Sequence, residues 1–115
     1  MIKHSLFAAF SSLAVLVSGP LLAIDRGDPA AGQEIAEAQC VACHAVDGTA
    51  DNPEWPKISG QYVDYLVKSL QQYQDGTREN AVMQGQVADL SAQDLRDVAS
   101  YYSDLDGELY VPRRR

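Results

Sequence analysis

The stretch "QCVACH", residues 39–44, places two cysteines and a histidine within five positions. Cys40 and Cys43 are the only cysteines of the 115-residue chain, and its one other histidine, His4, lies near the N-terminus. A structural zinc site needs four ligands, and the chain offers no second cysteine pair with a histidine to complete one. A thioredoxin-like redox site needs a strand before the cysteines, and no strand pattern precedes them. The pattern therefore argues against the commonest zinc and dithiol sites.

Covalent attachment of haem accounts for all three side chains. In the C-x-x-C-H pattern both thiols form thioethers with the vinyl groups on one porphyrin edge, and the adjacent histidine binds the iron. We therefore predict one haem c attached to Cys40 and Cys43, with His44 as an iron ligand. A plain disulfide stays open as an alternative, although it gives His44 no role. A large flat apolar group would also supply core to a chain whose two phenylalanines both lie within the first ten residues.

The N-terminal segment has the layout of a secretory signal. Lys3 and His4 precede the apolar run "LFAAFSSLAVLV", and "SGPLLA" then brings a helix breaker and the small residue Ala23. We expect residues 1–23 to be a signal peptide and residues 24–115 to form one haem-bearing domain in the periplasm, with no membrane span after cleavage. Retention of the segment as an uncleaved N-terminal anchor is the alternative, because residues 5–24 carry no charge.

The negative net charge of the chain indicates which classes of partner it can bind. Its net charge is −7, and only one basic and no acidic residue lies in 1–23, so residues 24–115 carry −8. Such a chain is not expected to bind nucleic acid, and it should attract proteins with basic docking faces.

Three helices and no strand are predicted, in residues 28–40, 60–76 and 90–107. Asp28 is a good N-cap with Pro29 at the first helical position, and Ser91 with Asp94 resembles a capping box. The intervening stretches 44–60 and 77–89 read as loops. The fold class is therefore all-α.

The sequence resembles class I cytochromes c, especially small bacterial monohaem proteins and single domains of the two-haem ones. The similar stretches are "GQEIAEAQCVACHAVDG", "NPEWPKISGQYVDYLVKSLQQYQDGTR" and "VMQGQVADLSAQDLRDVASYY". The resemblance implies a cytochrome c fold, with three to four helices around one covalently bound haem. It also implies that the first and last helices cross where Gly32 meets Tyr101, with Val98 beside them.

The second axial ligand of the iron is expected to be Met83. It is the one methionine after the predicted signal, thioether sulfur favours ferrous iron, and the family's ligand methionine occupies this position. Relatives often carry another methionine three residues later, where this chain has Gln86. The resemblance further implies that the carbonyl of Pro56 accepts from the histidine ring, and that Trp55 lies near a haem propionate. We expect Lys57 and Arg78 to be solvated surface residues, and a role in offsetting the charge of the propionates is the alternative for both.

These features predict a periplasmic one-electron carrier with His/Met axial ligation, monomeric and without enzymatic activity. One alternative is a haem-bearing subunit of a larger periplasmic oxidoreductase complex. A less favoured alternative is a haem protein that binds a small ligand, which would require Met83 to be away from the iron.

Overall fold

A computed structural model describes residues 26–107 of the chain, and the predicted signal segment and the basic tail lie outside this range. The described residues form helices α1 (Pro29–Gln39), α2 (Val41–His44), α3 (Val63–Gln74), α4 (Ala81–Val87) and α5 (Ala92–Asp104), without a strand. The all-α prediction is confirmed, and the three predicted helices correspond to α1, α3 and α5. Within residues 26–107, none of the helices has the length and apolar character needed to span a membrane.

The helix caps predicted from the sequence are present. The carboxylate of Asp28 accepts from the amide of Ala30 at the start of α1. Ser91 and Asp94 form a reciprocal capping box at the start of α5, each side chain accepting from the other residue's backbone amide. Hydrogen bonds from Ser91 hold the pKa of the Asp94 carboxyl below its ordinary value. Since caps satisfy amides that have no partner within the helix, both helix starts are fixed by local chemistry.

The prediction of a loop throughout residues 77–89 is wrong, because this stretch contains α4. The side chain of Asn80 accepts from the amide of Met83 at 3.0 Å and caps the helix. A helix of seven residues carries too little periodic apolar sequence to be recognised, and Gly85 interrupts it. The four-residue helix α2 was likewise hidden within the cysteine motif. The four longer helices agree with the family expectation of three to four, and α2 adds one four-residue helix within the described residues.

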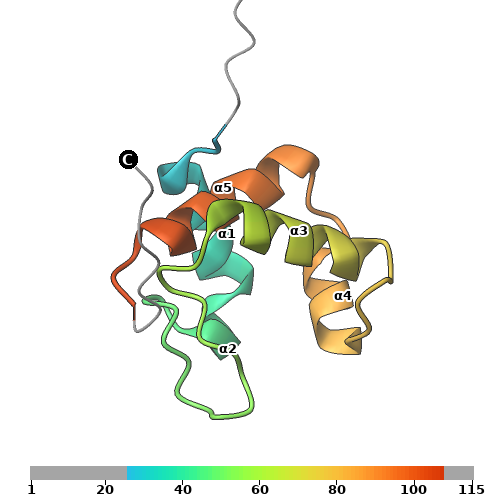
Figure 1. Ribbon diagram of the computed structural model, residues 1–115, viewed down its shortest axis with the longest axis horizontal. Coiled ribbons are helices and arrows are strands. Elements are labelled where there is room, and N and C mark those ends of the chain that lie inside the picture. Colours follow the sequence, from blue (N-terminus) through green and yellow to red (C-terminus); the bar gives the residue numbers. More distant parts are fainter. Residues whose placement is uncertain (1–25, 108–115) are drawn as a thin grey trace, which may run out of the picture.

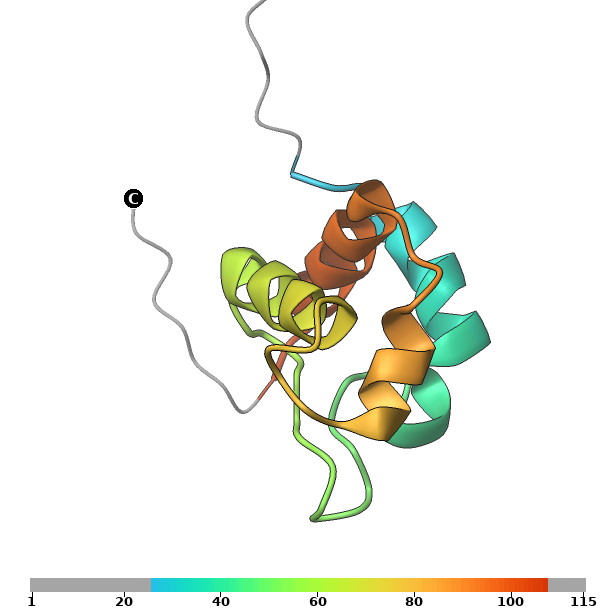
Figure 2. The same cartoon turned by 90° about the vertical axis from the view of Figure 1, so that its right-hand side faces the viewer.

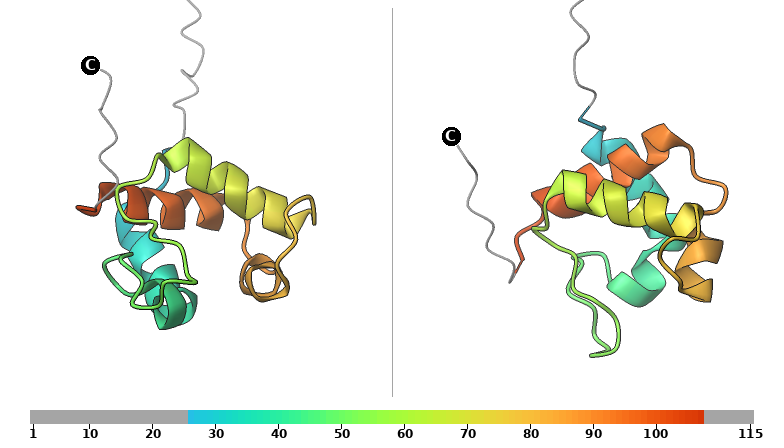
Figure 3. Two further views of the ribbon diagram at one scale, coloured as in Figure 1. Left: turned by 60° about the horizontal axis from the view of Figure 1, so that its bottom comes forward. Right: turned by 45° about the vertical axis from the view of Figure 1, so that its right-hand side comes forward.

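Helices α1 and α5 cross closely, and α3 packs on α5 (Figure 1). The two short helices, α2 and α4, lie on the same side of the α3–α5 pair, towards its opposite ends (Figure 3, left). Helix α4 is beside the C-terminal end of α3 (Figure 2). The buried hydrophobic cluster consists of Ala36, Leu66, Val98, Ala99, Tyr101 and Tyr102.

The crossing of α1 and α5 depends on Gly32. A Cβ atom at this position would lie 2.0 Å from the carbonyl oxygen of Asp97 and 2.9 Å from the amide nitrogen of Val98. These backbone atoms are the nearest in α5, and Tyr101 follows one turn later. Because backbone cannot move aside as a flexible side chain can, only glycine allows the helices to approach this closely.

Replacing Gly32 with alanine should lower the free energy of unfolding by about 2–3 kcal/mol, since the new methyl group forces the helices apart. The measurement is urea unfolding of the holoprotein. Gly85→Ala is the matched control, because Gly85 is also helical and a Cβ there would have no atom within 4 Å. It should leave stability unchanged or raise it by about 0.5–1 kcal/mol. Equal stability of Gly32→Ala and the wild type would show that the crossing does not need glycine.

Candidate functional site

A cavity of about 340 Å³ lies between the helices, and all five helices contribute to its walls. Its lining includes every residue that the sequence singled out as a site candidate: Cys40, Cys43, His44, Trp55, Pro56 and Met83. Much of the remaining lining is aliphatic, including Leu66, Leu70, Val87, Val98 and Ala99. The cavity thus combines an apolar interior with sulfur and imidazole groups.

His44 is buried, and its ring is held in one orientation. Its Nδ1 atom is 3.0 Å from the carbonyl oxygen of Pro56. A carbonyl only accepts, so Nδ1 carries a proton, and in the neutral ring Nε2 then has a lone pair for a metal ion. This is the arrangement expected for a histidine ligand, whose second ring nitrogen normally donates to an oxygen. The contact agrees with the expectation for Pro56.

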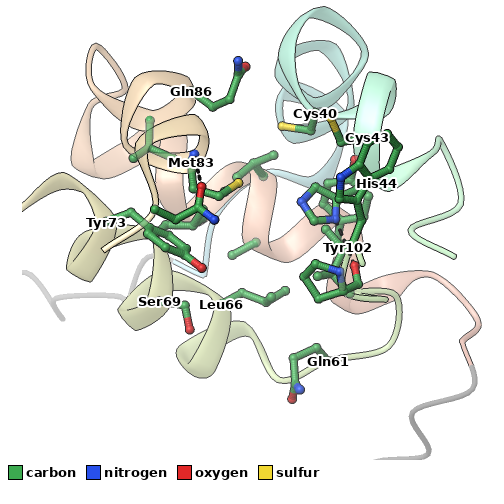
Figure 4. Close-up of a pocket in the computed structure, with 18 of the residues that line it drawn as sticks. Cys40, Cys43, His44, Gln61, Leu66, Ser69, Tyr73, Met83, Gln86 and Tyr102 are labelled. Atoms are coloured by element: carbon green, nitrogen blue, oxygen red, sulfur yellow. Dashed lines mark hydrogen bonds between the residues drawn. The ribbon is translucent and has the colours of Figure 1, made fainter. Parts of the chain in front are cut away.

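The cysteines lie on the same wall as His44 (Figure 4). Both thiols are partly buried and are not joined in a disulfide. Burial raises the pKa of the Cys40 thiol to about 11. Helix α1 ends at Gln39, and the amide of His44 donates to the carbonyl of Cys40 at 2.9 Å. This turn of backbone brings Cys40, Cys43 and His44 to one side of the cavity.

Two tyrosines of α5 support the backbone that follows His44. Tyr101 donates its hydroxyl to the carbonyl of Val46 at 2.8 Å, and Tyr102 donates to that of Ala45 at 3.3 Å. Ala45 has φ +60°, a conformation that residues with side chains rarely adopt. Sequence reasoning missed these contacts. The adjacent tyrosines near the end of a predicted helix were the only signal, because both polar hydroxyls had to find partners if the rings were buried.

Met83 lies across the cavity from His44. It belongs to α4, and its sulfur points into the cavity towards the histidine wall (Figure 4). Gln86 on the same helix is exposed and also lines the cavity. The two predicted axial ligands thus come from separate helices on opposite sides of one cavity.

Arg78 is exposed, as expected, but it also contacts two residues of α3. Its guanidinium carbon lies 5.0 Å from the centre of the Tyr73 ring, and Nη1 is 3.4 Å from the hydroxyl of Ser69. Hydrogen bonds to Arg78 and Ser69 lower the pKa of Tyr65. All four residues line the cavity, so this positive charge sits at its edge. Trp55 and Lys57 also line the cavity, with Trp55 39% exposed.

The lining fits a haem group better than a carboxylate-bound metal ion. No cluster of three or more His, Cys, Asp or Glu side chains suited to a metal ion occurs within residues 26–107. The cavity instead offers two thiols on one wall, one oriented imidazole, one thioether opposite, and aliphatic side chains between them. Thioether formation, axial ligation and an apolar environment are the needs of haem c.

Comparison with known proteins agrees with this fit. Residues 29–106 match the family described as Cytochrome c. The chain belongs to the cytochrome c family. As a member, it carries a covalently bound c-type haem.

Individual relatives place the chain among bacterial cytochromes. It is 45% identical over 82 residues to cytochrome c4 of Pseudomonas aeruginosa, a match that covers 71% of this chain and 40% of that protein. It is 41% identical over 80 residues to cytochrome c-554(548) of Halomonas halodenitrificans, covering 67% of this chain and 95% of that protein. The crystal structure of reduced recombinant cytochrome c4 from Pseudomonas stutzeri superposes with a TM-score of 0.61 at 29% identity, over 70% of this chain and 50% of that chain.

The relatives differ in length. This cytochrome spans 40% of the Pseudomonas aeruginosa cytochrome c4 but nearly all of the Halomonas halodenitrificans cytochrome c-554(548). The cytochrome c fold of residues 26–107 is thus shared with shorter and longer proteins alike.

Proposed function

We propose that this cytochrome is a periplasmic one-electron carrier and not an enzyme. In this proposal Cys40 and Cys43 hold the haem through thioethers, and His44 and Met83 are the axial ligands of its iron. The single observation that carries the proposal is the position of Met83, whose sulfur faces the imidazole of His44 across the cavity. The proposal keeps residues 1–23 as a cleaved export signal and residues 24–115 as the functional domain.

The haem iron, when bound, supplies a reversible one-electron change of oxidation state. The residues of this chain favour that use over catalysis. Pro56 fixes the proton on Nδ1 of His44 and so directs Nε2 into the cavity. If Met83 holds the opposite position, neither axial site is left for a substrate. Aliphatic side chains form much of the lining, and a neutral sulfur ligand in an apolar site favours the ferrous state.

Partner recognition follows from charge. The net charge of the chain is −7, and surface charge of one sign steers partners of the opposite sign. We propose a monomer that forms short-lived complexes with redox proteins whose docking faces are basic. The cavity wall with Cys40 and Cys43 is the place where electrons would enter and leave, because both residues are partly accessible there. Weak and brief contacts are typical of such electron-transfer pairs.

Met83→Ala should remove the weak red absorption band of the ferric protein that reports a sulfur–iron bond. The ferrous variant should bind carbon monoxide readily, because its sixth position is open. The midpoint potential should fall, since methionine ligation raises it. Visible spectroscopy in both oxidation states makes the measurement.

Val82→Ala is the control, because Val82 neighbours Met83 on α4 and is 62% exposed. It should keep the red band and remain unreactive towards carbon monoxide. A wild-type protein that already binds carbon monoxide, or a Met83→Ala protein with an unchanged spectrum, would contradict the proposed ligation.

The rate of electron transfer to a basic redox protein should fall as ionic strength rises from about 0.01 to about 1 M. The reason is that the Debye length shrinks from about 30 Å to about 3 Å over this range. Stopped-flow mixing at low partner concentration measures this rate. An acidic redox protein serves as the control and should react faster as salt is added. A rate to the basic partner that does not change with salt would refute charge steering.

A further inference from the structure

Helix α4, which carries Met83, is too short to be stable by itself. Helix α4 has seven residues, and Val87 is the one residue of it that is buried. Helices this short are not stable in water without tertiary contacts. The position of Met83 therefore depends on whatever fixes the two ends of α4 to the rest of the protein.

The start of α4 is held by short-range contacts in the chain. Asn80 caps the helix through the amide of Met83 at 3.0 Å. The amide of Arg78 donates to the carbonyl of Gln72 at 2.9 Å and closes the turn after α3. These contacts set where α4 begins, but they leave the direction of the helix free to vary.

At the end of α4, one side chain of α3 forms hydrogen bonds to the backbone. Gln74 is the last residue of α3, and its Nε2 donates to the carbonyl of Val87 at 2.6 Å and to that of Leu90 at 2.7 Å. A primary amide nitrogen carries two hydrogens, so one side chain can make both bonds at once. The last carbonyls of a helix lack partners within the helix. The carbonyl of Val87 accepts from Gln74 and, at 3.2 Å, from the amide of Leu90, whereas Gln74 alone links it to α3.

Met83 and Val87 are four residues apart and therefore lie one above the other on the same face of α4. Both line the cavity. If the end of α4 swings away from α3, Val87 leaves its buried position and Met83 turns with it. The two hydrogen bonds of Gln74 oppose that movement.

We infer that Gln74 is a positioning residue that keeps the thioether of Met83 directed into the cavity. The role of Gln74 in fixing α4 is independent of the proposed function. Only the expected effect on the iron rests on the proposed ligation by Met83. The role requires an N–H donor, since both partners are carbonyl oxygens. A carboxylate of the same shape would face two acceptors and repel them.

The test compares three variants of the holoprotein. Gln74→Glu keeps the size of the side chain and removes both donors. Gln74→Lys restores N–H donors on a longer chain. Gln71→Glu is the matched control, because Gln71 is exposed one turn earlier on α3 and donates to neither carbonyl, yet the substitution makes the same change in charge.

Hydrogen exchange measured by mass spectrometry reports on α4 without reference to the iron. Gln74→Glu should speed exchange of the amides in residues 81–90 about ten-fold, the effect of losing roughly 1–1.5 kcal/mol of net hydrogen bonding. Amides in α1 and α5 should exchange at wild-type rates. Gln74→Lys and Gln71→Glu should both resemble the wild type. Unchanged exchange in residues 81–90 of Gln74→Glu would overturn the inference.

Titration of the ferric protein with imidazole reports on Met83 itself. An external ligand binds only when the sulfur is away, so its apparent affinity follows the population of that state. Imidazole affinity should rise about ten-fold in Gln74→Glu and stay unchanged in the control. Faster exchange of α4 without a rise in affinity would overturn the link from Gln74 to Met83. The red band of the wild type tests the proposed ligation separately, so failure of the two ideas can be told apart.

Discussion

The contact of Gly32 with the backbone of α5 is the constraint on which the rest of the structure depends. A Cβ at Gly32 would lie 2.0 Å from the carbonyl oxygen of Asp97, so the two helices meet without a side chain between them. This crossing fixes the direction of α1, and the end of α1 leads directly into Cys40 and His44. The same α5 backbone carries Tyr101 and Tyr102, whose hydroxyls hold the carbonyls that follow His44. The crossing of α1 and α5 at Gly32 thus positions the wall of the cavity that carries Cys40 and His44.

The two walls of the cavity are held in different ways. The histidine wall has three hydrogen bonds that join it to two separate parts of the chain, the loop at Pro56 and the adjacent residues Tyr101 and Tyr102 of α5. The methionine wall is a seven-residue helix fixed by a cap at one end and by Gln74 at the other. Local stability follows the number of buried contacts, so the methionine side is the one expected to open first. If the proposed ligation holds, the imidazole of His44 would stay in place when the Met83 side opens.

Sequence reasoning succeeded where chemistry is local. The caps of α1 and α5 were readable from Asp28, Ser91 and Asp94, since capping needs particular residues at fixed spacing. The cysteine motif indicated the haem for the same reason. Family resemblance pointed to Pro56 and Met83, and both residues line the cavity. Helix α4 was missed because Asn80 and one short apolar run give no clear period. The contacts of Gln74 and Arg78 could not be predicted, because they join segments whose relative position is set only by tertiary packing.

Covalent haem in the cavity is the central claim, and the intact mass of the purified protein after denaturation tests it most directly. The account predicts the mass of the polypeptide plus one haem, which stays with the chain after acid–acetone extraction because thioether bonds survive unfolding. The protein must be produced in cells that attach haem to other c-type cytochromes, which serve as the positive control. A colourless protein at the mass of the bare polypeptide, made alongside properly loaded controls, would contradict the account.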